Sequence, residues 1–380
     1  MHPHNTSIRL ASWLLLGVAL LFSSSAAVAG DDVSATDPLT NQGSITLSSP
    51  GPISFGPDDI LFVGDPLAAS IFALRIDEKP SVMTGGPTEY NVAEIDHKVA
   101  AIMATSPRRL TINDLAVHPR TGSAYLSVSR GNGPGAITAL FRVRPDGETS
   151  LVSLTDVRYG RAEIPNAPAP PASSLERSNR ALSITDLAYA DGKVLVAGLS
   201  NEEFASTLRA VPFPFQEMGK GTSVEIYHGA HGAWETRAPV RTFAEYEIAG
   251  EPHLLAAYTC TPLVKFPTSE LQPGAKVRGT TVAELGNRNA PLDMVVYEKD
   301  GSDWILISNN RRGLMKVTTE NLAKIQGLTS RVERGATAGL SYETVTGLDG
   351  IEQLDRLDAT RALVVRRRDG GLFLESVALP

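Results

Sequence analysis

Residues 112–128 read INDLAVHPRTGSAYLSV, and these residues show most clearly the pattern that predicts the architecture. The polar pair Asn113 and Asp114 opens a short alternating segment that ends at the turn PRTG, and a compact apolar run begins at Ala124. Two short segments of this kind, joined by a turn that contains glycine, are typical of an antiparallel β-hairpin. The same layout recurs along the chain, so the hairpin is one unit of a repeat.

The repeat has three recognisable segments per unit. The central segment is a buried apolar run, found at residues 60–64, 124–128, 194–198, 254–258, 304–308 and 362–365. The segment before it opens with a polar residue, and we take five of these as equivalent: Asp114, Asp186, Thr242, Asp293 and Gln353. They are 51 to 72 residues apart. A third apolar segment follows each central run, as in SIFALRI (70–76) and GLFLESV (371–377).

Three strands and a looser fourth describe a four-stranded antiparallel blade, and blades stacked radially form a β-propeller. Fourth strands are expected at 150–154, 223–227 and 280–285. We therefore expect an all-β fold with one propeller of six blades, or seven if the longest interval, from Asp114 to Asp186, holds two. The last unit ends at its third strand. An N-terminal strand is expected to close it, and residues 44–47 are the candidate.

The N-terminus predicts export. Residues 1–29 contain Arg9, an apolar run from Ala11 to Phe22 and the small-residue sequence Ala27-Val28-Ala29, which is the pattern of a signal peptide cleaved before Gly30. The apolar run of about 12 residues is shorter than the roughly 20 needed to cross a bilayer. We expect a periplasmic or secreted protein with no membrane contact after cleavage, whose propeller domain covers 30–380. A proline-rich loop insertion is expected at 161–176.

Composition limits the classes of partner. The chain has 35 basic and 42 acidic residues, and this negative balance disfavours nucleic-acid binding, which needs a positive surface. Hydrophobic residues make up 42% of the chain, enough for a large core, and one cysteine rules out an intrachain disulfide. We expect a monomer whose partner is a small molecule or a metal ion.

Polar residues are concentrated in the segments expected at one mouth of the propeller. In a propeller, the turns between second and third strands and the connections between blades lie on the same face. The candidate ligand-binding residues in these segments are Asp65, Asn113, Asp114, Asp186, Asn201, Asn289, Asp293, Asn309 and Arg311. Carboxylate and amide oxygens suit calcium, and arginine suits an anionic group. The alternative is structural, because aspartates at strand starts also hydrogen bond to backbone N–H groups.

A second candidate site is the sequence YHGAHGAWE at residues 227–235. His228, His231 and Glu235, together with Cys260, offer nitrogen, oxygen and sulfur donors that suit zinc or copper. The alternative is that the two histidines only hydrogen bond and pack near Trp234.

The repeat resembles that of the β-propeller superfamily. A ring of Asp and Asn residues at an axial mouth is similar to that of the six-bladed calcium-dependent lactonases and soluble quinoprotein sugar dehydrogenases. No local motif of either family is present, so the resemblance assigns no catalytic residue. In the lactonases, calcium polarises the ester carbonyl. The sequence thus predicts an exported propeller that binds a small ligand or a metal ion at its mouth. The alternatives are a metal-dependent enzyme, either a lactonase-like hydrolase or a quinoprotein-like dehydrogenase, and a protein-interaction platform without chemistry.

Overall fold

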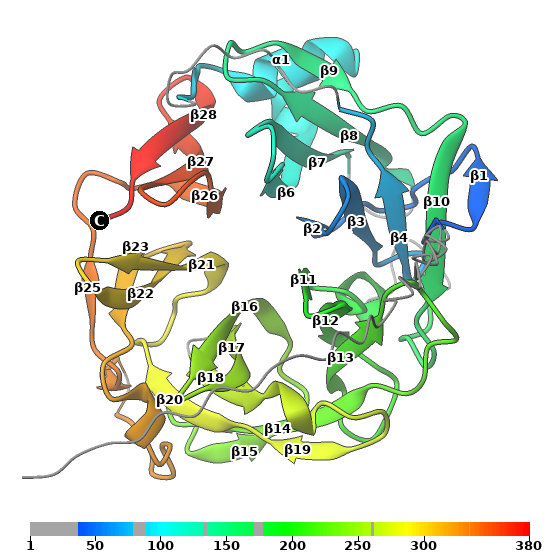
Figure 1. Cartoon of the computed structure of the whole chain (residues 1–380). Coiled ribbons are helices and arrows are strands. Elements are labelled where there is room, and N and C mark those ends of the chain that lie inside the picture. Colours follow the sequence, from blue (N-terminus) through cyan, green and yellow to red (C-terminus); the bar gives the residue numbers. More distant parts are fainter. Residues whose placement is uncertain (1–36, 79–88, 132–134, 171–177, 260–261, 334) are drawn as a thin grey trace, which may run out of the picture. The chain divides into compact units, whose positions relative to one another are not determined.

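Six antiparallel β-sheets stand around a central axis in the unit formed by residues 38–380 (Figure 1). The computed structural model describes residues 37–78, 89–131, 135–170, 178–259, 262–333 and 335–380. The predicted all-β propeller with six blades is confirmed. The predicted signal peptide lies outside the described residues, as does Cys260.

Each blade takes the name of its innermost strand. The β2 blade comprises β2 (Ile53–Phe55), β3 (Ile60–Asp65), β4 (Ser70–Arg75), β10 (Val157–Glu163) and β1 (Asn41–Gly43). The β6 blade comprises β6 (Leu110–Val117), β7 (Ala124–Arg130), β8 (Ile137–Val143) and β9 (Thr149–Leu151). The β11 blade comprises β11 (Asp186–Ala190), β12 (Lys193–Leu199), β13 (Ser206–Pro212), β14 (Thr222–His228) and β15 (Ala233–Glu235), with β19 (Lys276–Arg278) parallel to β14.

Three further blades follow in the chain. The β16 blade comprises β16 (Val240–Ile248), β17 (Glu251–Tyr258), β18 (Pro262–Pro267), β20 (Thr280–Glu284) and β24 (Ala338–Gly339). The β21 blade comprises β21 (Pro291–Lys299), β22 (Ser302–Asn309), β23 (Gly313–Thr318) and β25 (Tyr342–Thr344). The β26 blade comprises β26 (Ile351–Arg356), β27 (Arg361–Arg368), β28 (Gly371–Ala378) and β5 (Asn91–Val92). The expected fourth strands are confirmed as β9, β14 and β20. The short helices are α1 (Ile95–Ile102), η1 (Pro107–Arg109), η3 (Asn179–Leu182), η4 (Thr268–Glu270) and η5 (Leu322–Lys324).

The order of blades around the ring differs from their order in the chain. Neighbouring inner strands give the ring order β2, β11, β16, β21, β26, β6 (Figure 1). After β4 the chain adds β5 to the β26 blade, builds the β6 blade, and returns with β10 as the fourth strand of the β2 blade. The long interval between Asp114 and Asp186 therefore contains this returning strand and no seventh blade. Residues 161–163, expected in the loop insertion, belong to β10.

The ring is closed by a different segment from the one predicted. Val92 of β5 pairs with Leu374 of β28, whereas the candidate segment 44–47 pairs with no strand of the last blade. Ile45 instead donates its backbone N–H to the carbonyl of Leu154 at 3.0 Å. A two-residue strand is enough here because β5 extends a sheet that already has three strands.

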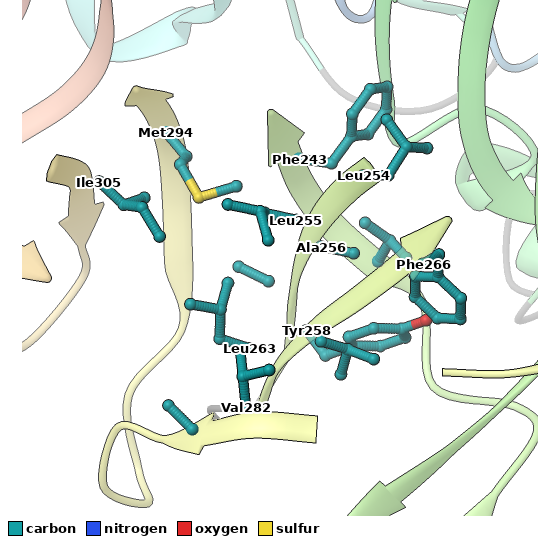
Figure 2. Close-up of a cluster of buried hydrophobic side chains, with 14 of the residues drawn as sticks. Phe243, Leu254, Leu255, Ala256, Tyr258, Leu263, Phe266, Val282, Met294 and Ile305 are labelled. Atoms are coloured by element: carbon teal, nitrogen blue, oxygen red, sulfur yellow. The ribbon is translucent and has the colours of Figure 1, made fainter. Parts of the chain in front are cut away.

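The apolar core lies between adjacent blades. Figure 2 shows Met294 and Ile305 of the β21 blade facing Leu255 and Leu263 of the β16 blade, and all four side chains are buried. Burying a side chain of this size contributes about 1.5–3 kcal/mol, so the repeated apolar runs stabilise the ring along every blade interface. The polar residues at the start of the inner strands lie outside this apolar core and face the central channel. None of the helices in the described part of the chain is long and apolar enough to cross a membrane.

Candidate functional site

A cavity of about 270 Å³ lies where the inner strands begin, at the mouth predicted from the sequence. Every blade contributes to its wall. The lining residues that belong to the inner strands or directly precede them are Pro52, Asn113, Asp114, Thr185, Asp186, Arg241, Thr242, Leu292, Asp293 and Gln353. The structure thus brings together four of the predicted ligand-binding residues, which are Asn113, Asp114, Asp186 and Asp293.

β-Bulges explain why adjacent residues share this wall. The register of β6, β16 and β21 shifts between Ile112 and Asp114, between Val240 and Thr242, and between Pro291 and Asp293. A bulge places two successive side chains toward the same side of a sheet, where regular pleating would separate them. Asn113 and Asp114 therefore both line the cavity, as do the matching pairs on the other two strands, Arg241 with Thr242 and Leu292 with Asp293.

Asp114, Asp186 and Asp293 connect adjacent blades in the same way. One oxygen of each carboxylate accepts a hydrogen bond from the next backbone N–H of its own strand, at 2.8–2.9 Å. The other oxygen accepts from a neighbouring inner strand at 2.7 Å, and the donors are Ile53, Phe243 and Leu354 respectively. The structural role anticipated for these aspartates is therefore present. Each carboxylate still has free lone pairs, since it offers about four acceptor positions.

The three carboxylates also act on one another through their charges. Burial raises the pKa of Asp114 and Asp293 well above the usual value, and the charge of Asp186 raises the pKa of Asp114 further. Burial likewise raises the pKa of Asp186 to about 7, although hydrogen bonds from the Phe243 N–H and the Thr242 hydroxyl oppose it. The three aspartate side chains are partly exposed to the channel, and protein surrounds them on their other sides. A positive charge in the cavity would relieve this repulsion.

Sequence reasoning missed two charged residues of this region. Arg241 lines the cavity, and its charge lowers the pKa of Asp186 against the effect of burial. Asp355 lies two residues beyond Gln353 on β26 and connects the backbone N–H groups of Arg356 and Val117, without lining the cavity. Asp355 could have been identified as an acidic residue in the least regular unit of the repeat, residues 351–360. The bulge that orients Arg241 has no signature in the sequence.

The other predicted ligand-binding residues lie elsewhere. Asp65 accepts hydrogen bonds from the backbone N–H groups of Ser48 and Ala68, so it stabilises a turn, and Asn201 lies in an exposed loop. Neither lines the axial cavity. Asn289 and Arg311 line a separate, open cavity of about 450 Å³, where Asn289 donates a hydrogen bond to Asn309 at 2.7 Å.

A larger cavity of about 520 Å³ lies away from the channel, beside β9 and β10. Tyr125 and Arg142 are among its lining residues, and both contact the buried carboxylate of Glu78. None of the residues predicted to bind a ligand or a metal lines it.

The predicted metal-ligand residues His228, His231 and Glu235 come together in the hairpin of β14 and β15. They lie at the outer edge of the β11 blade, on strands far from the channel-lining β11 (Figure 1). They do not line the axial cavity. The fourth predicted ligand, Cys260, is outside the described residues.

Comparison with known proteins finds similarity in structure only. No family model and no curated protein matches the sequence. The PQQ-bound aldose sugar dehydrogenase from Streptomyces coelicolor has 11% identity and a TM-score of 0.33, with 89% of this chain and 96% of that chain covered. The β-propeller domain of Cps50 (Swd1) from Myceliophteria thermophila has 11% identity and a TM-score of 0.35, with 90% and 99% covered. Neither similarity bears on the site.

Proposed function

We propose that this protein binds a small positively charged ligand in its axial cavity. The observation that supports this most directly is the position of Asp114, Asp186 and Asp293, which line one cavity from three different blades. The charge of Asp186 raises the pKa of Asp114 and of Asp293, and the charge of Asp114 raises the pKa of Asp293, so a cation in the cavity favours ionised carboxylates that otherwise repel one another. Asn113 and Gln353 add polar groups to the same wall.

The size of the site favours a ligand larger than a bare ion. Among the described residues, the one group of three or more His, Cys, Asp or Glu side chains that lie close enough to hold a metal ion is His228, His231 and Glu235, and the channel carboxylates are not part of it. The channel carboxylates are therefore too far apart to form a compact metal shell by themselves. A calcium ion that keeps some of its water, or a small amine, fits the proposal. Arg241 would face an anionic group on the same ligand.

Isothermal titration of the purified protein with calcium chloride and with a panel of small amines tests the proposal. We expect one of these probes to bind, and we expect Asp293→Asn to weaken that binding by about tenfold or more, because it removes one of three charges. Asp355→Asn is the matched control. This variant disrupts the same kind of connection between blades at a residue that does not line the cavity, and whose charge raises the pKa of Asp114 less than the charge of Asp186 does.

Two results would contradict the proposal. One is that neither calcium nor any amine binds to the folded wild-type protein. The other is that Asp293→Asn and Asp355→Asn weaken binding equally, because binding would then report the integrity of the ring and not the charge of the cavity.

We also propose that the protein is exported. The support is the sequence of residues 1–29, with its apolar run and its small residues before Gly30. Intact-mass measurement of the protein recovered from the periplasm or medium of an expressing bacterium tests this, and the expected chain begins at Gly30. Ala29→Arg should leave an uncleaved precursor, since a large charged residue does not suit the cleavage site. Recovery of unprocessed wild-type protein in the cytoplasm would contradict the proposal.

A further inference from the structure

A tight hairpin loop holds two imidazoles over one carboxylate. His228 ends β14, and the backbone N–H groups of His231 and Gly232 both donate to its carbonyl, at 3.1 and 2.8 Å. Gly232 has a positive φ of 68°, which closes the turn into β15. Glu235 of β15 lies opposite Ile226, so its side chain is on the same face of the hairpin as His228, which is two residues beyond Ile226 on β14.

The distances in this cluster are close to those of a chelate. Nδ1 of His228 lies 3.1 Å from one oxygen of Glu235, and Nδ1 of His231 lies 2.5 Å from the other. The two imidazole centroids are 3.9 Å apart. In a tetrahedral zinc site with bonds of about 2.0–2.1 Å, two ligand atoms are roughly 3.3 Å apart. A metal ion could therefore take the place of the protons that now join Glu235 to the imidazoles, with a small lengthening on the His231 side.

The environment of His228 supports this exchange. His228 is 1% exposed, and within the described residues its Nε2 atom has no hydrogen-bond partner. No second hydrogen bond therefore fixes which ring nitrogen carries the proton, and binding a metal at Nδ1 breaks no hydrogen bond at Nε2. The buried carboxylate of Glu284 lies against the loop and accepts from the backbone N–H of Ala230 at 3.3 Å, which adds negative charge beside the cluster.

We infer that His228, His231 and Glu235 form a binding site for a divalent transition metal ion, for which zinc is the natural probe. Two imidazoles and one carboxylate are a ligand set of zinc sites in which a fourth position stays open. The His231 side chain is 56% exposed, so that position faces solvent and takes water. The site lies outside the axial channel and is independent of the ligand proposed there.

Zinc titration of the mature chain, made without a histidine tag and freed of metal by a chelator, tests the inference. Intact mass must confirm that His2 and His4 of the predicted signal peptide are absent, because they could bind zinc themselves. We expect about one equivalent of zinc to bind and to raise the melting temperature. His231→Ala and Glu235→Gln should each weaken zinc binding by about 10–100-fold. His231 is exposed, so its variant should fold normally.

His97→Ala is the matched control, since His97 is also a half-exposed histidine beside a carboxylate, 3.3 Å from Asp96. We expect it to bind zinc like the wild type, and the same is expected of Asp293→Asn in the channel. The inference is overturned if the wild-type chain binds no zinc, or if His231→Ala and Glu235→Gln leave its zinc affinity unchanged. Loss of zinc binding in Asp293→Asn alone would overturn it as well, because the metal would then be in the channel.

Discussion

Asp293 of β21 accepts a hydrogen bond at 2.7 Å from the backbone N–H of Leu354 on β26, so one side chain both joins two blades and faces the axial cavity. Asp114 and Asp186 repeat the relationship at other positions in the ring. The same residues therefore stabilise the fold and supply the charge of the candidate site. Stability and binding must be separated experimentally, and Asp355 makes this possible.

We predict that Asp293→Asn and Asp355→Asn destabilise the protein to a similar degree. Each substitution replaces an oxygen acceptor with an amide NH₂ that cannot accept from the backbone, and an unpaired buried N–H costs about 1–3 kcal/mol. Urea unfolding of the two variants measures the loss. A change below about 0.5 kcal/mol in both would show that these hydrogen bonds between blades contribute little.

The pH dependence of stability should reveal the carboxyl group of Asp186. Its pKa is about 7 in the folded protein, against an ordinary aspartate pKa of 3.8, so between these values the folded state binds more protons than the unfolded state. Stability from this group is therefore present below pH 4 and is lost as the pH rises through 7. We expect the free energy of unfolding of the wild type to fall relative to Asp186→Asn by about 1–4 kcal/mol between these limits.

Calorimetry of both proteins at several pH values, in the presence of a chelator, measures this difference. The chelator matters because a bound cation would stabilise the ionised carboxylates and hide the effect. Wild-type stability that stays constant relative to Asp186→Asn from pH 5 to 8, or that rises relative to this variant as the pH rises, would contradict the assignment.

The sequence predicted the blades because each central strand is a continuous apolar run, as at residues 304–308 and 362–365. It did not predict that β5 joins the β26 blade or that β10 returns to the β2 blade. A strand that joins a neighbouring sheet has the same alternation as one that stays in its own, so the pattern does not identify its partner. Similarly, Asp114, Asp186 and Asp293 were predictable from their equivalent positions. Arg241 was not, because a bulge orients it.

Gly198 should be essential for the shape of the cavity. A Cβ atom at this position of β12 would lie 2.1 Å from the carbonyl oxygen of Ser183, in the segment that leads into Thr185 and Asp186. Gly198→Ala must push this backbone away, so we expect a destabilisation of about 1–3 kcal/mol together with weaker binding in the axial cavity. Thermal unfolding and titration measure the two effects.

Gly43→Ala is the control for this substitution, because a Cβ atom at Gly43 would meet nothing within 4 Å. We expect it to change stability by less than about 0.5 kcal/mol and to leave binding intact. If Gly198→Ala behaves in the same way, the contact with Ser183 does not position the cavity wall.

Tyr90 should stabilise the closure of the ring. Its backbone N–H donates to the Ser376 hydroxyl at 2.8 Å in the β26 blade, while its hydroxyl accepts from the Ala124 N–H at 2.9 Å in the β6 blade. Tyr90→Phe keeps the buried ring but leaves the Ala124 N–H without its acceptor. We expect a loss of about 1–3 kcal/mol, with faster hydrogen exchange at Ala124 and in β28.

Tyr189→Phe distinguishes loss of this connection from a general effect of removing a hydroxyl group. The Tyr189 ring stacks on Phe62 at 5.5 Å and the residue is only partly buried, so a change below about 0.5 kcal/mol is expected on loss of its hydroxyl. Tyr90 directly precedes the two-residue strand β5 and adds to a contact between the β26 and β6 blades that also includes the hydrogen bond from Val117 to Asp355 and a shared apolar cluster. Equal stability of the two variants would place that contribution in the surrounding apolar packing instead.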